Sequence, residues 1–97
     1  MPEMRFVVRW PDERVMSCYS PSLVVREYLE VGRAYALDDF VERSRTALRI
    51  ASDRVREKYG HACANALGQL SLIEATAERY GGLDAPEVRV EAFDPPE

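Results

Sequence analysis

Hydrophobic and polar residues alternate along residues 4–10, which is the pattern of a β-strand with one buried face. Pro11 begins a turn after it, and residues 14–19 resume a weaker alternation. The sequence therefore predicts an N-terminal β-hairpin.

A third alternating stretch, residues 86–93, returns to the strand pattern near the end of the chain. Its outer face is charged, and the first strand offers Arg5 and Arg9 on its own outer face. Because opposite charges on neighbouring strands attract, we predict that the last strand lies beside the first. The residues predicted to face inward are Val88, Val90 and Ala92.

Two long segments carry apolar residues at the spacing of amphipathic helices. The first helix is predicted at 39–59, with Asp39 as N-cap and Glu42 completing a capping box. Gly60 ends it, and a second helix follows at about 61–80. The second helix is rich in small residues, which favours an antiparallel helical hairpin. Its predicted buried stripe is Cys63, Ala66, Leu67, Leu70, Ile73, Ala77 and Tyr80.

The segment CYSPS, residues 18–22, holds a thiol, a phenol and two hydroxyls around a proline. Ser20 before Pro21 is typical of a helix start, a capping hydroxyl followed by proline at the first helical position. We therefore predict a short helix at 21–30. The adjacent Val24 and Val25 disfavour a helix slightly, so a strand is the alternative.

Together these elements predict one α+β domain over residues 1–97, with a small three-stranded, largely antiparallel sheet. The hairpin, the short helix, the long helical hairpin and the returning strand follow one another in that order. So small a domain cannot easily bury apolar groups on both faces of its hairpin, so we predict a homodimer. We expect its interface on the hairpin or on the short helix, Leu23 to Leu29.

The charge balance argues against a nucleic-acid partner, since 17 acidic residues outnumber 13 basic ones and give a net charge of −4. A local group of Arg5, Arg9, Arg14 and Arg26 is more simply a set of solvated side chains than an anion site. No apolar run is long enough to predict a signal peptide or a membrane span. Two cysteines without an export signal predict reduced thiols in the cytoplasm.

The CYSPS segment is the first candidate for a reactive or ligand-binding site. The candidate ligand-binding residues are Cys18, Tyr19, Ser20, Arg26 and Tyr35. A reactive cysteine needs a lowered thiol pKa, and a place in the core is the simpler reading of Cys18. His61 and Cys63 lie two residues apart and lack a close cysteine pair, so we predict no metal site. The sequence contains no cofactor motif and no recognisable catalytic group.

Several stretches resemble a known family: MRF-VRWPD, CYSPSLV, LDDFVERSR-AL-IAS-RVR-KYG and AC-NAL-QL-IE. They are similar to the small bacterial nitrogen starvation response proteins, a family encoded in a conserved gene cluster around a nitrilase. The resemblance spans about residues 2 to 80. It implies a cytoplasmic protein that serves nitrogen acquisition, from nitriles or cyanide. It brings no catalytic residue and no cofactor.

Two functions are consistent with these features. The first is a non-enzymatic accessory or interaction protein of nitrogen acquisition, whose partners are products of neighbouring nitrogen-assimilation genes. The second is a small thiol-dependent enzyme or ligand-binding protein centred on Cys18. The reactivity of the Cys18 thiol distinguishes them.

Overall fold

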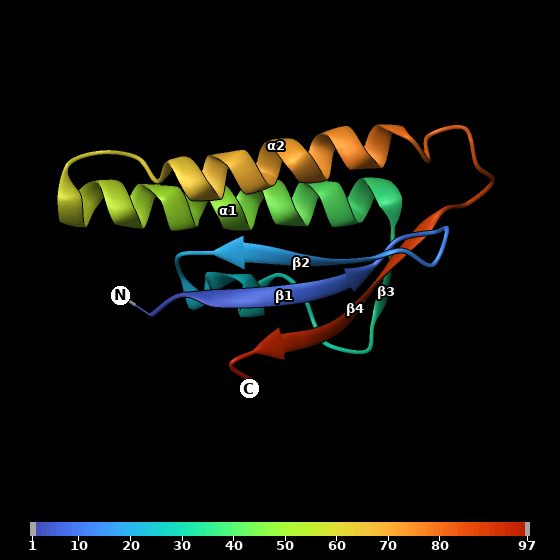
Figure 1. The fold of residues 1–97 in the computed structure, drawn as a ribbon, viewed down its shortest axis with the longest axis horizontal. Helices are drawn as coiled ribbons and strands as arrows, with labels where there is room; N and C mark the ends of the chain where they lie inside the picture. Colours follow the sequence, from blue (N-terminus) through green and yellow to red (C-terminus); the bar gives the residue numbers. More distant parts are fainter. Residues whose placement is uncertain (1, 97) are drawn as a thin grey trace.

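A computed structural model describes residues 2–96 of the chain. Two long helices form one layer and a four-stranded sheet forms the other (Figure 1). This architecture confirms the predicted α+β class. In chain order the elements are β1 (Met4–Arg9), β2 (Val15–Ser20), the 3-10 helix η1 (Leu23–Glu27), β3 (Ala34–Ala36), α1 (Leu37–Tyr59), α2 (Ala64–Glu78) and β4 (Glu87–Asp94).

The sheet is antiparallel throughout, with the strand order β2-β1-β4-β3. β1 pairs with β2 from Met4 opposite Ser20 to Arg9 opposite Val15, which is the predicted hairpin. The last strand lies beside the first, as its charge pattern predicted. Arg9 Nε donates to Glu91 Oε1 across these two strands at 2.9 Å.

The prediction of three strands was wrong, because β3 adds a fourth. Its three residues are too few to show an alternation that could be recognised in the sequence. β3 pairs with β4, with Tyr35 opposite Val88, and both of these side chains are buried. Gly32 N also donates to Val90 O at 2.7 Å, which joins the segment before β3 to the same strand.

A β-bulge in β4 explains why Ala92 does not face inward as predicted. Val8 lies opposite Val90, whereas Val7 lies opposite Ala92, so β4 holds one extra residue at this point. Beyond the bulge the two faces of the strand exchange. Ala92 is exposed and Phe93 is buried in its place.

α1 begins at Leu37, two residues before the predicted cap. β3 continues directly into the helix, and Leu37 N donates to Pro86 O at 2.9 Å. The N-cap position is occupied by Ala36, which makes no side-chain capping bond. Asp39 instead accepts from Arg43 Nε at 3.0 Å, one helical turn further on. The predicted capping box is therefore wrong.

α2 begins at Ala64 and ends at Glu78, so it is shorter than the predicted 61–80. Gly60 ends α1 with a left-handed φ of 85°, as expected of a glycine in that position. The buried stripe was predicted only in part. Cys63 is the half-buried N-cap of α2, and Leu67 is 41% exposed. The members that are buried are Ala66, Leu70, Ile73, Ala77 and Tyr80.

The short helix forms, but as a 3-10 helix with a different cap. η1 begins at Leu23, and its N-cap is Ser22, whose Oγ accepts from Val24 N at 3.3 Å. The predicted cap, Ser20, is still part of β2. The strand alternative for this segment is thereby excluded.

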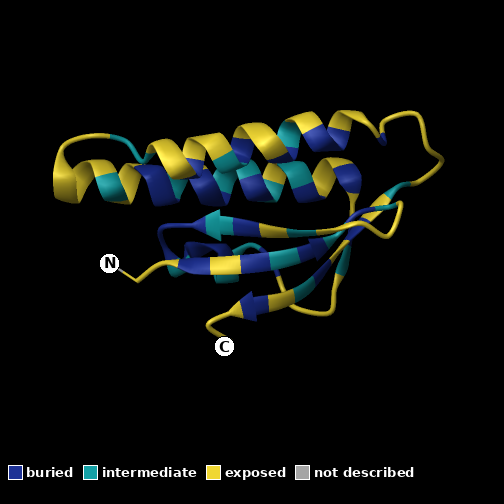
Figure 2. Ribbon diagram, viewed as in Figure 1, coloured by how far each residue is buried: buried dark blue, intermediate teal, exposed yellow. Residues whose placement is uncertain are grey.

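The core lies between the helices and one face of the sheet (Figure 2). Trp10, just after β1, is central to it and is only 2% exposed. Its ring stacks on Tyr80 at a centroid distance of 5.7 Å and meets the edge of Phe40 at 5.6 Å. Trp10 thus connects the sheet with α1 and with the segment that follows α2. Truncation of a buried aromatic residue of this kind typically costs 3–5 kcal/mol.

We expect Gly60→Ala to lower the free energy of unfolding by about 1 kcal/mol, because alanine is strained at a left-handed φ. Gly82→Ala is the matched control, since Gly82 does not have a positive φ and an added Cβ meets nothing within 4 Å. Urea unfolding of both variants measures the difference. Equal stability of the two variants would contradict the assigned role of Gly60.

Candidate functional site

The CYSPS segment does not form one site, because its residues alternate between the two faces of β2. Cys18 points into the core and is fully buried, whereas Tyr19 lies on the opposite face and is half-buried. Burial raises the pKa of the Cys18 thiol to about 12, and the opposing effect of Arg5 is smaller. The thiol is therefore protonated at neutral pH, as in a cysteine that packs as a small apolar residue.

The two serines of this segment stabilise the turn between β2 and η1. Ser20 Oγ donates to Ser22 O at 2.8 Å and accepts from Ser22 N at 3.3 Å. Ser22 Oγ caps η1 and also accepts from Arg54 Nη1 of α1 at 3.0 Å. Both serines are buried, so their hydroxyls serve the fold. The polar side chains of CYSPS therefore stabilise the connection between β2 and η1 and do not form a reactive site.

The other predicted candidates lie apart from one another. Tyr35 is buried, and its hydroxyl accepts from Glu30 N at 2.8 Å. Arg33 and Arg43 lie over its ring at 4.9 and 5.1 Å. Arg26 donates to the carbonyl of Pro95 at 2.6 Å and so holds the segment after β4.

One face of the sheet is not covered by the helices (Figure 2). On β1 the side chains alternate strictly, with those toward the helices buried and those on the other side exposed or half-buried. We call this second side the bare sheet face. Its residues are Arg5, Val7 and Arg9 of β1, Val15, Ser17 and Tyr19 of β2, and Glu87, Arg89, Glu91, Ala92 and Asp94 of β4.

Tyr19 is the one predicted candidate on the bare sheet face. Its hydroxyl donates to Glu3 Oε2 at 3.1 Å, and Arg5 lies over its ring at 5.9 Å. Burial and then the hydrogen bond to Glu3 raise the pKa of this hydroxyl. Its backbone N–H donates to Gln69 Oε1 of α2 at 3.0 Å, which fixes the edge of β2 against the helix layer. A shallow hollow of about 280 Å³ lies beside Tyr19 and Arg5.

The bare sheet face carries charges of both signs, from three arginines and from the carboxylates of Glu87, Glu91 and Asp94. Glu91 accepts from Arg9 and raises the pKa of that guanidinium, whereas Asp94 lies opposite Arg5 on the neighbouring strand. Within residues 2–96, Arg5 and Arg89 form no ion pair. Arg89 instead donates to Gly32 O at 2.9 Å. Arg5 and Arg89 are therefore available to pair with carboxylates of another molecule.

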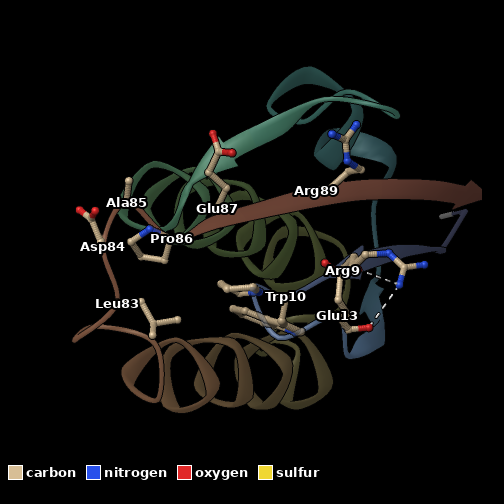
Figure 3. Close-up of a pocket in the computed structure, with 10 residues that line it drawn as sticks. Arg9, Trp10, Glu13, Leu83, Asp84, Ala85, Pro86, Glu87 and Arg89 are labelled. Atoms are coloured by element: carbon tan, nitrogen blue, oxygen red, sulfur yellow. Dashed lines mark hydrogen bonds and ion pairs between the residues drawn. The ribbon is translucent and has the colours of Figure 1, made fainter.

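A cleft of about 460 Å³ lies at the end of the sheet, between the β1–β2 turn and the segment before β4 (Figure 3). Arg9 and Arg89 lie on one side of it and Asp84 on the other. Trp10 also lines the cleft, and its buried indole N–H has no hydrogen-bond partner. Through its two arginines the cleft is continuous with the bare sheet face.

Sequence reasoning found part of this surface. Arg5 and Arg9 belong to the basic group noted in the sequence, but Arg14 pairs with Asp12 in the turn at 3.2 Å. Arg26 makes its contacts with the segment after β4. Arg89 was missed as a member, although the charge alternation of residues 86–93 placed it on the outer face. The order of the strands was needed to bring it near Arg9.

Within the part of the chain that the structure describes, no group of three or more His, Cys, Asp or Glu residues could hold a metal ion. In the same residues, no helix has the length and apolar character that crossing a membrane requires.

A family model described as "Nitrogen starvation-induced protein NitG" matches residues 5–93. The matched range includes the bare sheet face except Asp94, and all the elements from η1 to α2. No curated protein and no solved structure matches the chain.

The buried thiol predicts a specific dependence of stability on pH. Below about pH 9 the Cys18 thiol is protonated in both the folded and the unfolded chain, so it does not make stability depend on pH. Between about pH 9 and 12 the unfolded chain loses this proton and the folded chain keeps it. The free energy of unfolding should then fall by up to about 1.4 kcal/mol per pH unit from this group.

Cys18→Val removes this group while keeping an apolar side chain of similar size. We expect urea unfolding at pH 7 to 11 to show a smaller loss of stability in Cys18→Val than in the unchanged protein. Cys63→Ala, which alters the half-buried cysteine, should keep the full loss. Parallel pH profiles for all three proteins would show that Cys18 is not buried as described.

Proposed function

Because the chain belongs to the family of nitrogen starvation-induced protein NitG, we propose that it is a non-enzymatic accessory protein of bacterial nitrogen acquisition. It acts by binding another protein on the bare sheet face. The observation that carries this proposal is the unpaired positive charge of Arg5 and Arg89 beside Val7, Tyr19 and Ala92.

The composition of this face supports a protein partner. Arginine and tyrosine are enriched in protein interfaces, where a planar guanidinium and an aromatic ring offer both apolar area and hydrogen bonds. Val7 and Ala92 lie opposite each other and supply apolar contact area between the charges. The hollow beside Tyr19 lies at one end of this surface and the cleft at Arg9 and Arg89 at the other, so both ends can receive side chains of a partner. The partner surface is expected to present carboxylates to Arg5 and Arg89.

We place the partner among the proteins encoded by neighbouring nitrogen-assimilation genes, in the use of nitriles or cyanide. The resemblance to a family encoded around a nitrilase supports this context. We further propose that the protein works in the cytoplasm. The two free cysteines, Cys18 and Cys63, are consistent with a reducing compartment.

The alternative, a thiol-dependent enzyme centred on Cys18, gains no support from the placement of that residue. A nucleophilic cysteine has a lowered pKa and an accessible sulfur, whereas Cys18 is fully buried with a raised pKa. Its neighbours in sequence do not assist it, because the Tyr19 hydroxyl donates to Glu3 and the Ser20 hydroxyl donates to Ser22 O.

The test is co-expression of the protein with the products of its neighbouring genes under nitrogen limitation, followed by purification of complexes. We expect Arg5→Glu to reduce recovery of the partner about tenfold or more, because the substitution reverses a charge on the bare sheet face. Arg49→Glu is the matched control. Arg49 is exposed on α1 and forms no ion pair within residues 2–96.

Equal loss of the partner in both variants would mean that overall charge decides binding, and the proposed face would be wrong. Full recovery with Arg5→Glu and with Tyr19→Ala would also reject it. Turnover of a nitrile by the purified protein, abolished in Cys18→Ala, would favour the enzymatic alternative instead.

A further inference from the structure

α2 differs from α1 in having almost no charge. Of the 15 residues of α2 only Glu74 and Glu78 are charged, whereas α1 has 11 charged residues among 23. Glu74 accepts from Arg45 of α1 at 2.8 Å, so it serves the contact between the two helices. A helix with apolar residues on all sides is normally buried on all sides.

One side of α2 is nevertheless exposed (Figure 2). The buried residues of α2 face α1 and the sheet, and an apolar strip remains on the other side. We call this strip the outer face of α2. Leu67 and Leu72 on it are 41% and 51% exposed. Its residues are Ala64, Leu67, Gly68, Ser71, Leu72 and Ala75.

Gly68 in the middle of this face has no role in the monomer. A Cβ added at this position meets nothing within 4 Å, and the backbone there does not have a positive φ. Glycine in a helix costs about 1 kcal/mol relative to alanine. The residue therefore becomes useful where a second backbone approaches α2 closely from outside.

We propose that the outer face of α2 is the interface of a homodimer, in which two copies of α2 pack antiparallel about a two-fold axis. A two-fold interface uses the same patch on both copies, and an uncharged patch can meet its own copy without repulsion. Two helices that cross at glycine, alanine and serine can approach more closely than helices separated by large side chains.

The charges at the two ends of the helix layer are complementary in this arrangement. Residues 49–59, at one end, contain four basic and two acidic side chains. Residues 74–87, at the other end, contain four acidic side chains and one basic one. Antiparallel packing brings the basic end of one copy toward the acidic end of the other (Figure 1).

The length of the outer face of α2 suits a second helix better than a small ligand. α2 is about 22 Å long at 1.5 Å per residue, so the strip runs along about four helical turns. Tyr59 and Leu83, which are 57% and 52% exposed, come just before and just after α2 in the chain and add exposed apolar side chains near its two ends. An antiparallel dimer places Tyr59 of one copy near Leu83 of the other.

The interface expected from the sequence, at the hairpin or at Leu23 to Leu29, exposes fewer apolar side chains than the outer face of α2. Val24, Val25 and Leu29 are already buried in the monomer. On the hairpin Val15 is 54% exposed, which makes it the matched control position.

Light scattering of the purified protein at 10 to 100 µM tests the proposal without any partner protein. We expect a mass of about twice the 11.1 kDa of one chain. Leu72→Glu puts a carboxylate near the two-fold axis and should raise the dissociation constant at least tenfold. Gly68→Gln should do the same by keeping the backbones apart, while its melting temperature under monomeric conditions is unchanged or higher.

Val15→Glu adds the same charge to the hairpin and should leave the dimer intact. A mass near 11.1 kDa for the unchanged protein at 100 µM would overturn the proposal. So would a dimer that survives both α2 substitutions, or one that Val15→Glu dissociates. Because only the purified chain is used, failure here is separate from failure of the proposed partner on the bare sheet face.

Discussion

The packing of Trp10 against Tyr80 and Phe40 is the interaction on which the rest of the structure depends. It fastens the end of β1 to the open end of the helical hairpin, where α1 begins and where α2 has just ended. Once that contact is made, the two helices lie along one side of the sheet and bury every inward side chain of β1. Within residues 2–96 there is no further long helix to cover the other side. The bare sheet face is the consequence.

Periodicity in the sequence predicted the elements that are long enough to show it. The hairpin, both long helices and the neighbouring positions of β1 and β4 follow from spacing and charge. β3 is too short to have a recognisable period, and the bulge in β4 exchanges its two faces after Glu91. The sequence does not show which side of α2 faces the core, because the exposed Leu67 and Leu72 are as apolar as the residues that are buried.

The candidate site was harder to predict than the fold, for a geometric reason. Successive residues of a strand point to opposite faces, so Cys18 and Tyr19 are neighbours in sequence with different surroundings. Conversely, Arg9 and Arg89 are 80 positions apart and meet only because β4 returns beside β1. Residues that are close in sequence, Ser20 and Ser22, form the turn between β2 and η1. The charged surface is formed by residues that are distant in sequence and become neighbours through strand pairing.

The central claim is that the sheet presents its uncovered side to a partner protein. Mapping of amide chemical shifts by NMR, with and without the co-purified partner, tests it most directly. The account predicts that the largest changes fall on Arg5, Val7 and Arg9 and on residues 89–92, with little change along α1. Changes concentrated on α1 or η1, with β1 and β4 unaffected, would contradict it.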